Sequence, residues 1–266
     1  MINVDNNIPF FSIITINYNS GIDILSTISS VNKQGFRDFE YLIIDGGSND
    51  ISLDVINQHS NNIDFTCSEK DNGIYDAINK GIASSKGRFI ILLHAGDYLD
   101  NKNSLKDIHS YIVNEPLNDF YLSDALICSK INISIPIRYY SANIFKVSRL
   151  CFGIMPAHPA IIIKREVYDL IGTYSTEYQI ASDFDFIIRL FRIKNVRFTY
   201  MNKVFLRMID GGISDKLSNK IILQNELKLI CQKHKISTNH FMLLARFIIK
   251  FPSVIQKMHV IKSFLG

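Results

Sequence analysis

FFSIITINYNS, at residues 10–20, begins the pattern that decides the fold, in which short apolar runs alternate with amphipathic segments. Four short runs rich in β-branched and aromatic residues are typical of buried strands: residues 11–16, 41–44, 63–67 and 89–93. Three segments with apolar side chains three and four residues apart are predicted to be helices: residues 22–34, 51–59 and 74–85. This alternation predicts an α/β fold with right-handed crossovers and a mostly parallel, Rossmann-like sheet flanked by helices.

The remainder of the chain is less regular. Strands are predicted at residues 119–123 and 196–205, helices at 165–171 and 183–193, and hairpins within 126–140. We expect one domain over residues 1–214, with halves at 1–100 and 101–214, followed by a helical tail over residues 215–266.

Composition excludes several classes of protein. With 47% apolar and 20% charged residues, this chain of 266 residues has too much core-forming material for a disordered protein. Its four cysteines form no CxxC pair, which argues against a zinc site or a disulfide framework. No uncharged apolar stretch reaches the roughly 18 residues of a membrane span, and no basic segment precedes the first apolar residues. We therefore expect a reduced protein in the cytoplasm.

Basic charge is concentrated in the tail. Residues 215–266 carry nine basic and two acidic side chains, whereas the whole chain has a formal net charge of only +4. Within the tail, residues 239–250 and 253–265 repeat apolar side chains at mostly three- and four-residue spacing, with lysine and arginine among them. This pattern predicts helices lying in an anionic membrane interface. Packing of these apolar faces on the preceding domain is the alternative, and nucleic acid is disfavoured because the tail is too apolar.

Polar residues follow each of the four N-terminal strands, in the groups 17–19, 45–48, 68–71 and 94–97. Each group alone is ordinary, because Asp-Gly pairs mark turns and an aspartate often caps a helix. The carboxyl ends of parallel strands meet at one edge of the sheet, and that edge is where α/β sheets bind ligands. We therefore expect a ligand site at this edge.

The residue types at the edge favour a nucleotide. Tyr18 offers a flat face for a base, and the Asp45 carboxylate can accept hydrogen bonds from a base imide or ribose hydroxyls. No GxGxxG motif follows the first strand and no GxxxxGK[ST] motif occurs, so a dinucleotide site or a P-loop is disfavoured. Asp97, which ends the run FIILLHAGD, can hold Mg²⁺ or Mn²⁺, since these ions bind carboxylate and phosphate oxygens.

The runs FFSIITINYNS, EYLIIDGGSND and SEKDNGIYDAINKGIASSKGRFIILLHAGDYL resemble the N-terminal half of family 2 inverting glycosyltransferases with the GT-A fold. Farther on, MPAHPAIIIKREVYDLIGTY, YQIASDFDFIIRL and RMIDGGIS are similar to the bacterial subgroup that builds O-antigen, capsule or exopolysaccharide. The resemblance spans residues 10–214. It implies transfer of a sugar from a nucleoside diphosphate sugar, with UDP favoured, to a hydroxyl of a lipid-linked or glycan acceptor. It also implies a nucleotide-sugar half at 1–100, an acceptor half at 101–214, and a protein peripheral on the inner face of the cell membrane.

The resemblance gives donor-binding roles to matched positions. The segment that lines base and ribose corresponds to Thr15, Asn17, Tyr18 and Asn19, and the base-binding carboxylate corresponds to Asp45. Asp71 and Lys80 match positions near the ribose and diphosphate, and His158 matches a histidine near the acceptor or diphosphate. Asp97 keeps only the last carboxylate of the family's metal motif, so a Mn²⁺ or Mg²⁺ ion would take much of its coordination from the diphosphate.

The resemblance also implies the catalytic base. Asp183, in the run ASDFD, matches the carboxylate that similar enzymes use to deprotonate the acceptor. Asp185 lies two residues on and cannot share its helix face, so it could equally be a first-turn acid favoured by the helix dipole. Asp124 matches a family aspartate without a defined role. His234 belongs to a group of histidines without ligand spacing, which are expected at the surface.

The predicted reaction is a single in-line displacement that inverts the anomeric centre. Asp183 removes the acceptor proton, and a divalent ion on Asp97 stabilises the departing diphosphate. Two other functions stay open. One is a catalytically inactive sugar-nucleotide binding protein, which is suggested by Gly96 at a position where an acid could stand. The other is a metal-dependent nucleotidyltransferase, which is disfavoured because the segment NYNSGID after the first strand lacks the basic residues that would hold a triphosphate.

Overall fold

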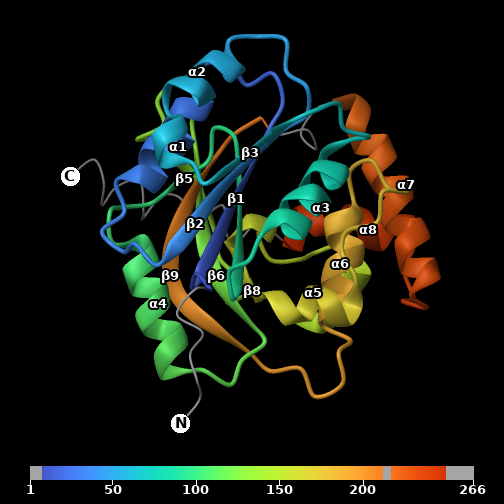
Figure 1. Cartoon of the computed structure of the whole chain (residues 1–266). Helices are drawn as coiled ribbons and strands as arrows, with labels where there is room; N and C mark the ends of the chain where they lie inside the picture. Colours follow the sequence, from blue (N-terminus) through green and yellow to red (C-terminus); the bar gives the residue numbers. More distant parts are fainter. Residues whose placement is uncertain (1–7, 212–216, 250–266) are drawn as a thin grey trace.

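A mixed sheet forms the centre of the protein (Figure 1). The computed structural model describes residues 8–211 and 217–249. Within these residues nine strands pair in the order β3-β2-β1-β4-β8-β6-β9-β5, with β7 beside β6. Their bounds are β1 (Phe11–Asn17), β2 (Phe39–Asp45), β3 (Phe65–Ser68), β4 (Phe89–His94), β5 (Tyr98–Leu99), β6 (Phe120–Cys128), β7 (Pro136–Tyr140), β8 (Ile161–Lys164) and β9 (Phe198–Ile209).

The strand directions confirm the expected α/β fold with a mostly parallel sheet. β1 pairs in parallel with both β2 and β4, and β2 pairs in parallel with β3. β6 and β9 are also parallel, whereas β8 runs antiparallel to β4 and to β6, and β5 runs antiparallel to β9. The first half of the sheet is therefore regular, and the mixed pairing is confined to the second half.

Helices cover both faces of the sheet. α1 (Ile24–Asn32), α2 (Ser52–Gln58) and α4 (Ser104–Asn114) lie on one face. α3 (Ile74–Ser84), α5 (Arg165–Ile171) and α6 (Ser182–Leu190) lie on the other, and α7 (Leu217–Lys233) packs outside α6. α8 (His240–Ile249) follows α7, and short 3₁₀ turns lie at η1 (Ser60–Asn62), η2 (Val147–Phe152) and η3 (His158–Ala160).

Strand β1 shows how the sequence builds two cores at once. Alternate residues of a strand point to opposite faces, and both faces of this sheet are covered by helices. Ile13 accordingly packs with Ile24 of α1, while Ile14 packs with Ile78 of α3. The continuous apolar run is thus a consequence of burial on both sides.

Several boundaries differ from the expectations. The strand predicted at 119–123 continues to Cys128 as β6, so the predicted hairpin consists of the end of β6 and the antiparallel β7. Helix α4 was not predicted, although Leu105, Ile108 and Ile112 form its buried face at three- and four-residue spacing. α7 was not predicted as an element of the domain either.

The described part of the tail packs on the domain. Leu227 and Ile230 of α7 and Leu243 of α8 are buried in the same core cluster as α6. A Cβ built on Gly153, at the end of η2, would lie 3.0 Å from Leu227 and 3.2 Å from Leu243, so the tail helices approach η2 closely. Residues 217–249 therefore follow the alternative in which the apolar faces of the tail pack on the preceding domain. The predicted boundary at residue 214 and the segment 253–265 lie outside the described residues. Among the described helices, none has the length and apolar character that a membrane crossing requires.

Candidate active site

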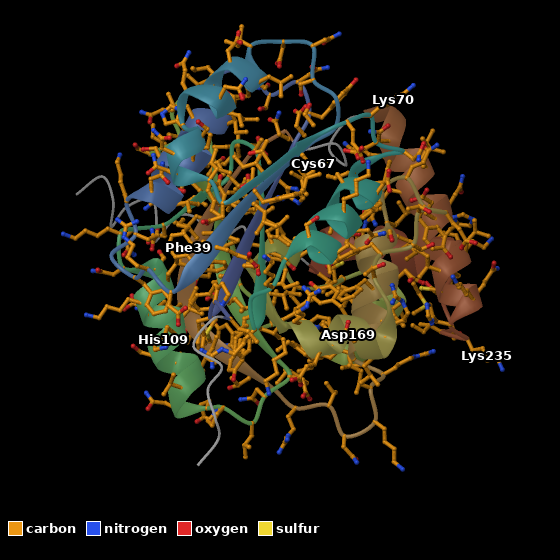
Figure 2. The ribbon with its side chains drawn as sticks, viewed as in Figure 1. Phe39, Cys67, Lys70, His109, Asp169 and Lys235 are labelled. Carbon is orange, nitrogen blue, oxygen red and sulfur yellow. The ribbon has the colours of Figure 1, made fainter. Side chains whose placement is uncertain are left out.

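The polar groups that follow β1, β2 and β3 meet at one edge of the sheet, as expected. Asn17, Asp45 and Ser68 are neighbours in the strand register. In Figure 2 the chain rises from Phe39 at the start of β2 and from Cys67 within β3 toward Lys70, so this edge is the upper one in the view. The sequence reasoning therefore located the edge correctly.

Asp45 is completely enclosed by hydrogen bonds from the protein. Its Oδ1 accepts from Asn17 Nδ2 at 2.6 Å and from Ser48 Oγ at 2.5 Å, and its Oδ2 accepts from Ser68 Oγ at 2.7 Å. The backbone N–H groups of Ser48 and Gly47 also donate to Oδ2. Burial alone would raise the pKa of Asp45, but these hydrogen bonds outweigh it and hold the pKa below its usual range. Asp45 thus ties three strand ends together as a stable carboxylate.

The neighbouring residues of the same segment divide into buried and exposed positions. Thr15 is fully buried, with its hydroxyl 3.1 Å from Tyr41 Oη. Asn17 is buried and donates to Asp45 and Ser48. Asn19 has a positive φ of 47° and is exposed, and its backbone N–H donates to Ser48 Oγ. Thr15 and Asn17 therefore support the edge from within, and their predicted contacts with base and ribose stay predictions.

Tyr18 is the exposed aromatic side chain of this segment, with 67% of its surface accessible. A Cβ built on Gly46 would lie 3.3 Å from the Tyr18 ring and only 2.9 Å from the Asp71 carboxylate. Glycine at position 46 therefore lets Tyr18 and Asp71 approach the same point of the backbone. The arrangement leaves an aromatic face beside a carboxylate at the strand ends.

Lys80 holds Asp71 in place. Lys80 Nζ lies 2.5 Å from Asp71, 2.8 Å from Glu69 and 3.6 Å from Asp76. Bonds to Asp71 and then to Glu69 raise the pKa of the lysine above its usual value. Burial raises the pKa of Asp71, and the bond from Lys80 offsets part of that effect. The structure thus brings the two predicted residues together as an ion pair.

Asp97 lies at the other end of the candidate site, after β4. Its Oδ1 accepts the backbone N–H of Ile209 at 2.9 Å, and burial raises its pKa to about 7. Gly96 has a φ of +96°, a conformation that residues with a Cβ rarely adopt. Glycine at position 96, where the resemblance would allow an acid, therefore suits the turn that positions Asp97.

These residues fit a weakly held divalent cation. Within residues 8–211 and 217–249, Asp97 Oδ2 makes no hydrogen bond to the protein, and no three acidic, histidine or cysteine side chains gather as a ready-made metal cage. One carboxylate with a free oxygen is a common protein contribution to a Mg²⁺ site whose other ligands are phosphates and water. Among the described residues, Asp97 would therefore hold a metal together with a bound diphosphate.

His158 is buried, and His94, at the end of β4, is partly buried near it. Burial lowers the pKa of His158 to about 3, with a contribution from His94, and burial lowers the pKa of His94 to about 4. Both rings are therefore neutral near pH 7. His158 Nε2 lies 2.5 Å from Tyr174 Oη, whereas His94 Nδ1 has no hydrogen-bond partner within the part of the chain that the structure describes. His158 is thus a hydrogen-bonded core residue, and its role toward a ligand stays a prediction.

Asp183 and Asp185 occupy opposite sides of α6. Asp183 Oδ1 accepts from Tyr75 Oη at 3.3 Å and from the N–H of Phe184 at 2.8 Å, and burial raises its pKa to about 6. Asp185 is bound by Arg189 Nε at 2.9 Å and by His234 Nε2 at 2.8 Å. The expectation that His234 lies free at the surface is wrong, because Asp185 draws it against α6. Asp183 is therefore the carboxylate left available for proton transfer.

Two residues near Asp183 were missed by the sequence reasoning. Tyr75, four residues after Asp71 at the start of α3, donates to the carbonyl of Ile180 at 2.5 Å as well as to Asp183. Glu226 of α7 accepts the backbone N–H groups of the loop that precedes α6. Tyr75 lies within the quoted run KDNGIYDAINKG and could have been weighed as a site residue, but bonds from a side chain to a remote backbone leave no sequence signal.

Asp124 has a structural role. Its Oδ2 accepts from Tyr139 Oη at 2.5 Å and from Tyr200 Oη at 2.6 Å, and its Oδ1 accepts the N–H of Ala142. The side chain is fully buried, and its partners come from β7, β9 and the segment after β7. Asp124 therefore joins the elements of the second half.

Comparison with known proteins shows what this chain is similar to. Residues 12–123 match the family described as Glycosyl transferase family 2. A PGL/p-HBAD biosynthesis glycosyltransferase of Mycobacterium bovis is 27% identical over 261 residues, which cover 97% of each chain. The poly(ribitol-phosphate) beta-N-acetylglucosaminyltransferase TarS of Staphylococcus aureus is 29% identical over 107 residues, or 38% of this chain and 18% of TarS.

Two solved structures share the fold. The S. aureus TarS 1–349 complex with UDP-GlcNAc matches 94% of this chain and 80% of its own, with a TM-score of 0.64 and 19% identity. The mannosyltransferase PcManGT of Pyrobaculum calidifontis, in complex with GDP-Man and Mn²⁺, matches 97% of this chain and 76% of its own, with a TM-score of 0.62 and 13% identity. The GT-A fold expected from the sequence is thereby confirmed.

Proposed function

This chain belongs to the family 2 glycosyltransferases with the GT-A fold, and on that premise we propose that it transfers a sugar from a nucleoside diphosphate sugar with inversion. The observation that carries the proposal is the position of Asp183 and its contacts with neighbouring residues. Asp183 lies in the first turn of α6, its Oδ1 accepts from Tyr75 Oη, and its pKa of about 6 leaves it mostly ionised yet basic near neutral pH.

The proposed donor is a UDP-sugar bound across the ends of β1 to β4. Tyr18 stacks on the base, since its ring is exposed at the edge and lies close to Gly46. Asp71, held by Lys80, faces the same point and accepts from the ribose hydroxyls. The UDP-GlcNAc complex of the structural neighbour TarS supports the choice of UDP.

The proposed reaction needs a base and a stabilised leaving group. Asp183 accepts the proton of the acceptor hydroxyl as its oxygen attacks the anomeric carbon, while the bond to the diphosphate breaks on the opposite side. Tyr75 keeps the Asp183 carboxylate oriented through its hydroxyl. A Mn²⁺ or Mg²⁺ ion, when bound at Asp97, supplies Lewis-acid stabilisation of the departing diphosphate. The Mn²⁺ in the neighbour PcManGT supports this assignment.

The proposed acceptor is lipid-linked. The turn between β6 and β7 exposes Ile131, Ile133 and Ile135 to solvent, and Ile131 is 99% accessible. Ile133 also lines a cavity of about 350 Å³ that reaches Gly96, beside the candidate metal carboxylate. Exposed apolar side chains close to a reaction centre suit the apolar part of an acceptor. The protein would work at the inner face of the cell membrane, with the basic residues beyond 249 supporting attachment.

Transfer is tested with the purified full-length chain. UDP, GDP and dTDP sugars, each with Mn²⁺, are screened by thermal shift, because a bound donor raises the melting temperature. The donor that binds is then offered to short acceptors with and without an apolar tail, and the anomeric configuration of the product is read by NMR. Stabilisation by a UDP-sugar and an inverted product are expected. A retained configuration contradicts the single displacement, and donor binding without transfer favours the inactive binding protein.

Membrane attachment is tested separately. Sedimentation with vesicles containing acidic phospholipid is compared for the full chain and for a chain ending at residue 249. Binding that weakens with salt and is lost on truncation is expected. Equal sedimentation of the two proteins contradicts a role for the terminal segment.

A further inference from the structure

Glu226 links α7 to the loop that carries the candidate base. Its Oε1 accepts the N–H of Gln179 at 2.7 Å, and its Oε2 accepts those of Ile180 at 3.0 Å and Ala181 at 2.9 Å. The side chain is only 8% exposed. Three successive backbone donors therefore converge on one buried carboxylate just before α6 begins.

The same loop is held from the opposite side by Tyr75. The Tyr75 hydroxyl donates to the carbonyl of Ile180, while the N–H of that residue donates to Glu226. Ile180 is thus fixed at both of its backbone polar groups, by α3 and by α7. Asp183 follows three residues later in the first turn of α6, so its position depends on this loop.

We propose that Glu226 is a positioning residue for Asp183, which makes helix α7 part of the catalytic machinery. The proposal rests on the assignment of Asp183 as the base. A carboxylate suits the task because it accepts several N–H groups at once and makes charge-assisted bonds, which are about twice as strong as neutral ones. A glutamine at the same position keeps the size but turns one acceptor into a donor that faces an N–H.

Glu226 also acts on Asp183 through its charge. The groups around Asp183 are Tyr75 from α3, Tyr174 from the loop after α5, and Glu226 from α7. Burial is the main cause of the raised pKa of Asp183, Tyr75 lowers it, and Glu226 raises it. Removing the Glu226 charge should therefore lower the pKa of Asp183 and move the acid limb of the kcat profile to lower pH.

The test compares Glu226→Gln with Glu226→Asp and with Glu177→Gln as the matched control. Glu177 lies two residues before Gln179, and its side chain is exposed and pairs with Lys233 at 3.6 Å. Removing the Glu177 charge therefore changes the local charge without releasing the N–H groups that Glu226 binds. We expect Glu226→Gln to lower kcat on the order of tenfold or more, with the KM for donor nearly unchanged, and to move the acid limb downward. Glu226→Asp keeps the charge and should lower kcat while leaving the limb in place. Glu177→Gln should change neither.

Amide hydrogen exchange of residues 179–181 gives a readout that does not need turnover. Faster exchange confined to this loop is expected in both Glu226 variants. If Glu226→Gln retains the wild-type kcat, pH profile and loop protection, the positioning role is wrong and the transferase assignment stands. If Glu226→Gln does not fold, a Glu226→Asp protein with wild-type kcat and loop protection overturns the inference equally. If Asp183→Asn retains turnover, the base assignment fails whatever the Glu226 variants do.

Discussion

Asp45 and Asp183 show two opposite ways in which this protein treats a carboxylate withdrawn from solvent, fully for Asp45 and partly for Asp183. Asp45 accepts five hydrogen bonds from three strand ends, and its pKa lies below the usual range. Asp183 accepts from Tyr75 and Phe184, and its pKa is raised to about 6. Asp45 therefore stays ionised at physiological pH, whereas Asp183 can take up a proton near neutral pH.

This difference in hydrogen bonding and pKa suits Asp45 to a fixed binding edge and Asp183 to proton transfer. A carboxylate saturated with donors keeps a fixed shape and suits the rigid edge on which a nucleotide would rest. A carboxylate with few donors in a buried place keeps its basicity, which a general base needs.

The largest effect is expected from Asp183→Asn. Without a proton acceptor, transfer should fall on the order of 100-fold or more, while donor binding stays nearly intact. Initial rates and donor titration by calorimetry measure the two quantities side by side. Asp185→Asn is the control, since it should lower stability by releasing Arg189 and His234 but spare the rate per folded molecule. If Asp183→Asn keeps the normal rate and Asp185→Asn loses it, Asp185 is the base and Asp183 is not.

Asp97→Ala should remove the metal-dependent part of donor affinity. The loss is expected to be at least about tenfold in the presence of Mn²⁺, because changes around a metal ligand typically weaken binding by that much. Chelation by EDTA should reduce the wild type to the same affinity. Asp23→Asn, which alters an exposed carboxylate beside Gly96, is the control and should leave affinity unchanged. Full wild-type activity in EDTA would exclude a metal requirement.

Asp45→Asn should mainly cost stability. Loss of the charge-assisted bonds is expected to lower the free energy of unfolding by about 1–3 kcal/mol at pH 7. The pKa of Asp45 is lowered in the folded protein, so its stabilisation is complete above the unfolded value of about 3.9 and is lost as pH falls through the folded pKa. Urea unfolding at pH 7 and pH 3 should therefore show a gap between variant and wild type that narrows in acid. Asp54→Asn, an exposed change on α2, should show no gap at either pH.

The smallest effect is expected from Tyr75→Phe. Its hydroxyl lowers the pKa of Asp183, so removing it should raise that pKa and move the acid limb of kcat to higher pH by a fraction of a unit. This direction is opposite to that expected for Glu226→Gln. The kcat profile between pH 5 and 8 measures both. Tyr168→Phe removes a hydroxyl that bonds to Tyr174 instead, and an equal shift in that variant would show that the effect is not specific.

The sequence was most informative where structure is local. The strands and helices of the first hundred residues follow from hydrophobic period and glycine punctuation, and their polar ends located the edge where Tyr18 and Asp71 meet. The spacing of Asp183 and Asp185 showed that only one could face the site. The family resemblance favoured Asp183, but the sequence could not show that Arg189 and His234 occupy Asp185, because His234 comes from outside α6.

Long-range partners explain what the sequence left unresolved. Glu226 is recognisable as the last acid of the chain, yet its partners are backbone N–H groups, which every residue except proline possesses. Thr15 and Asn17 match a ligand-lining segment, but whether they face a ligand or the protein depends on Tyr41 and Asp45 of β2 and on Ser48 in the loop after it. In the second half, β6, β9, α5 and α6 were predicted, but β8 and its antiparallel pairings were not, because they are set by tertiary packing.

The position of Glu226 in the chain has a consequence for biosynthesis. Domains generally fold as units while the ribosome still extends the chain, N-terminal parts first. The strand ends of the proposed nucleotide edge are synthesised early, whereas the carboxylate that fixes the loop before α6 arrives only with α7. The loop that carries the proposed base therefore gains its Glu226 contacts late in synthesis, together with the part of the core that Leu227 and Ile230 complete.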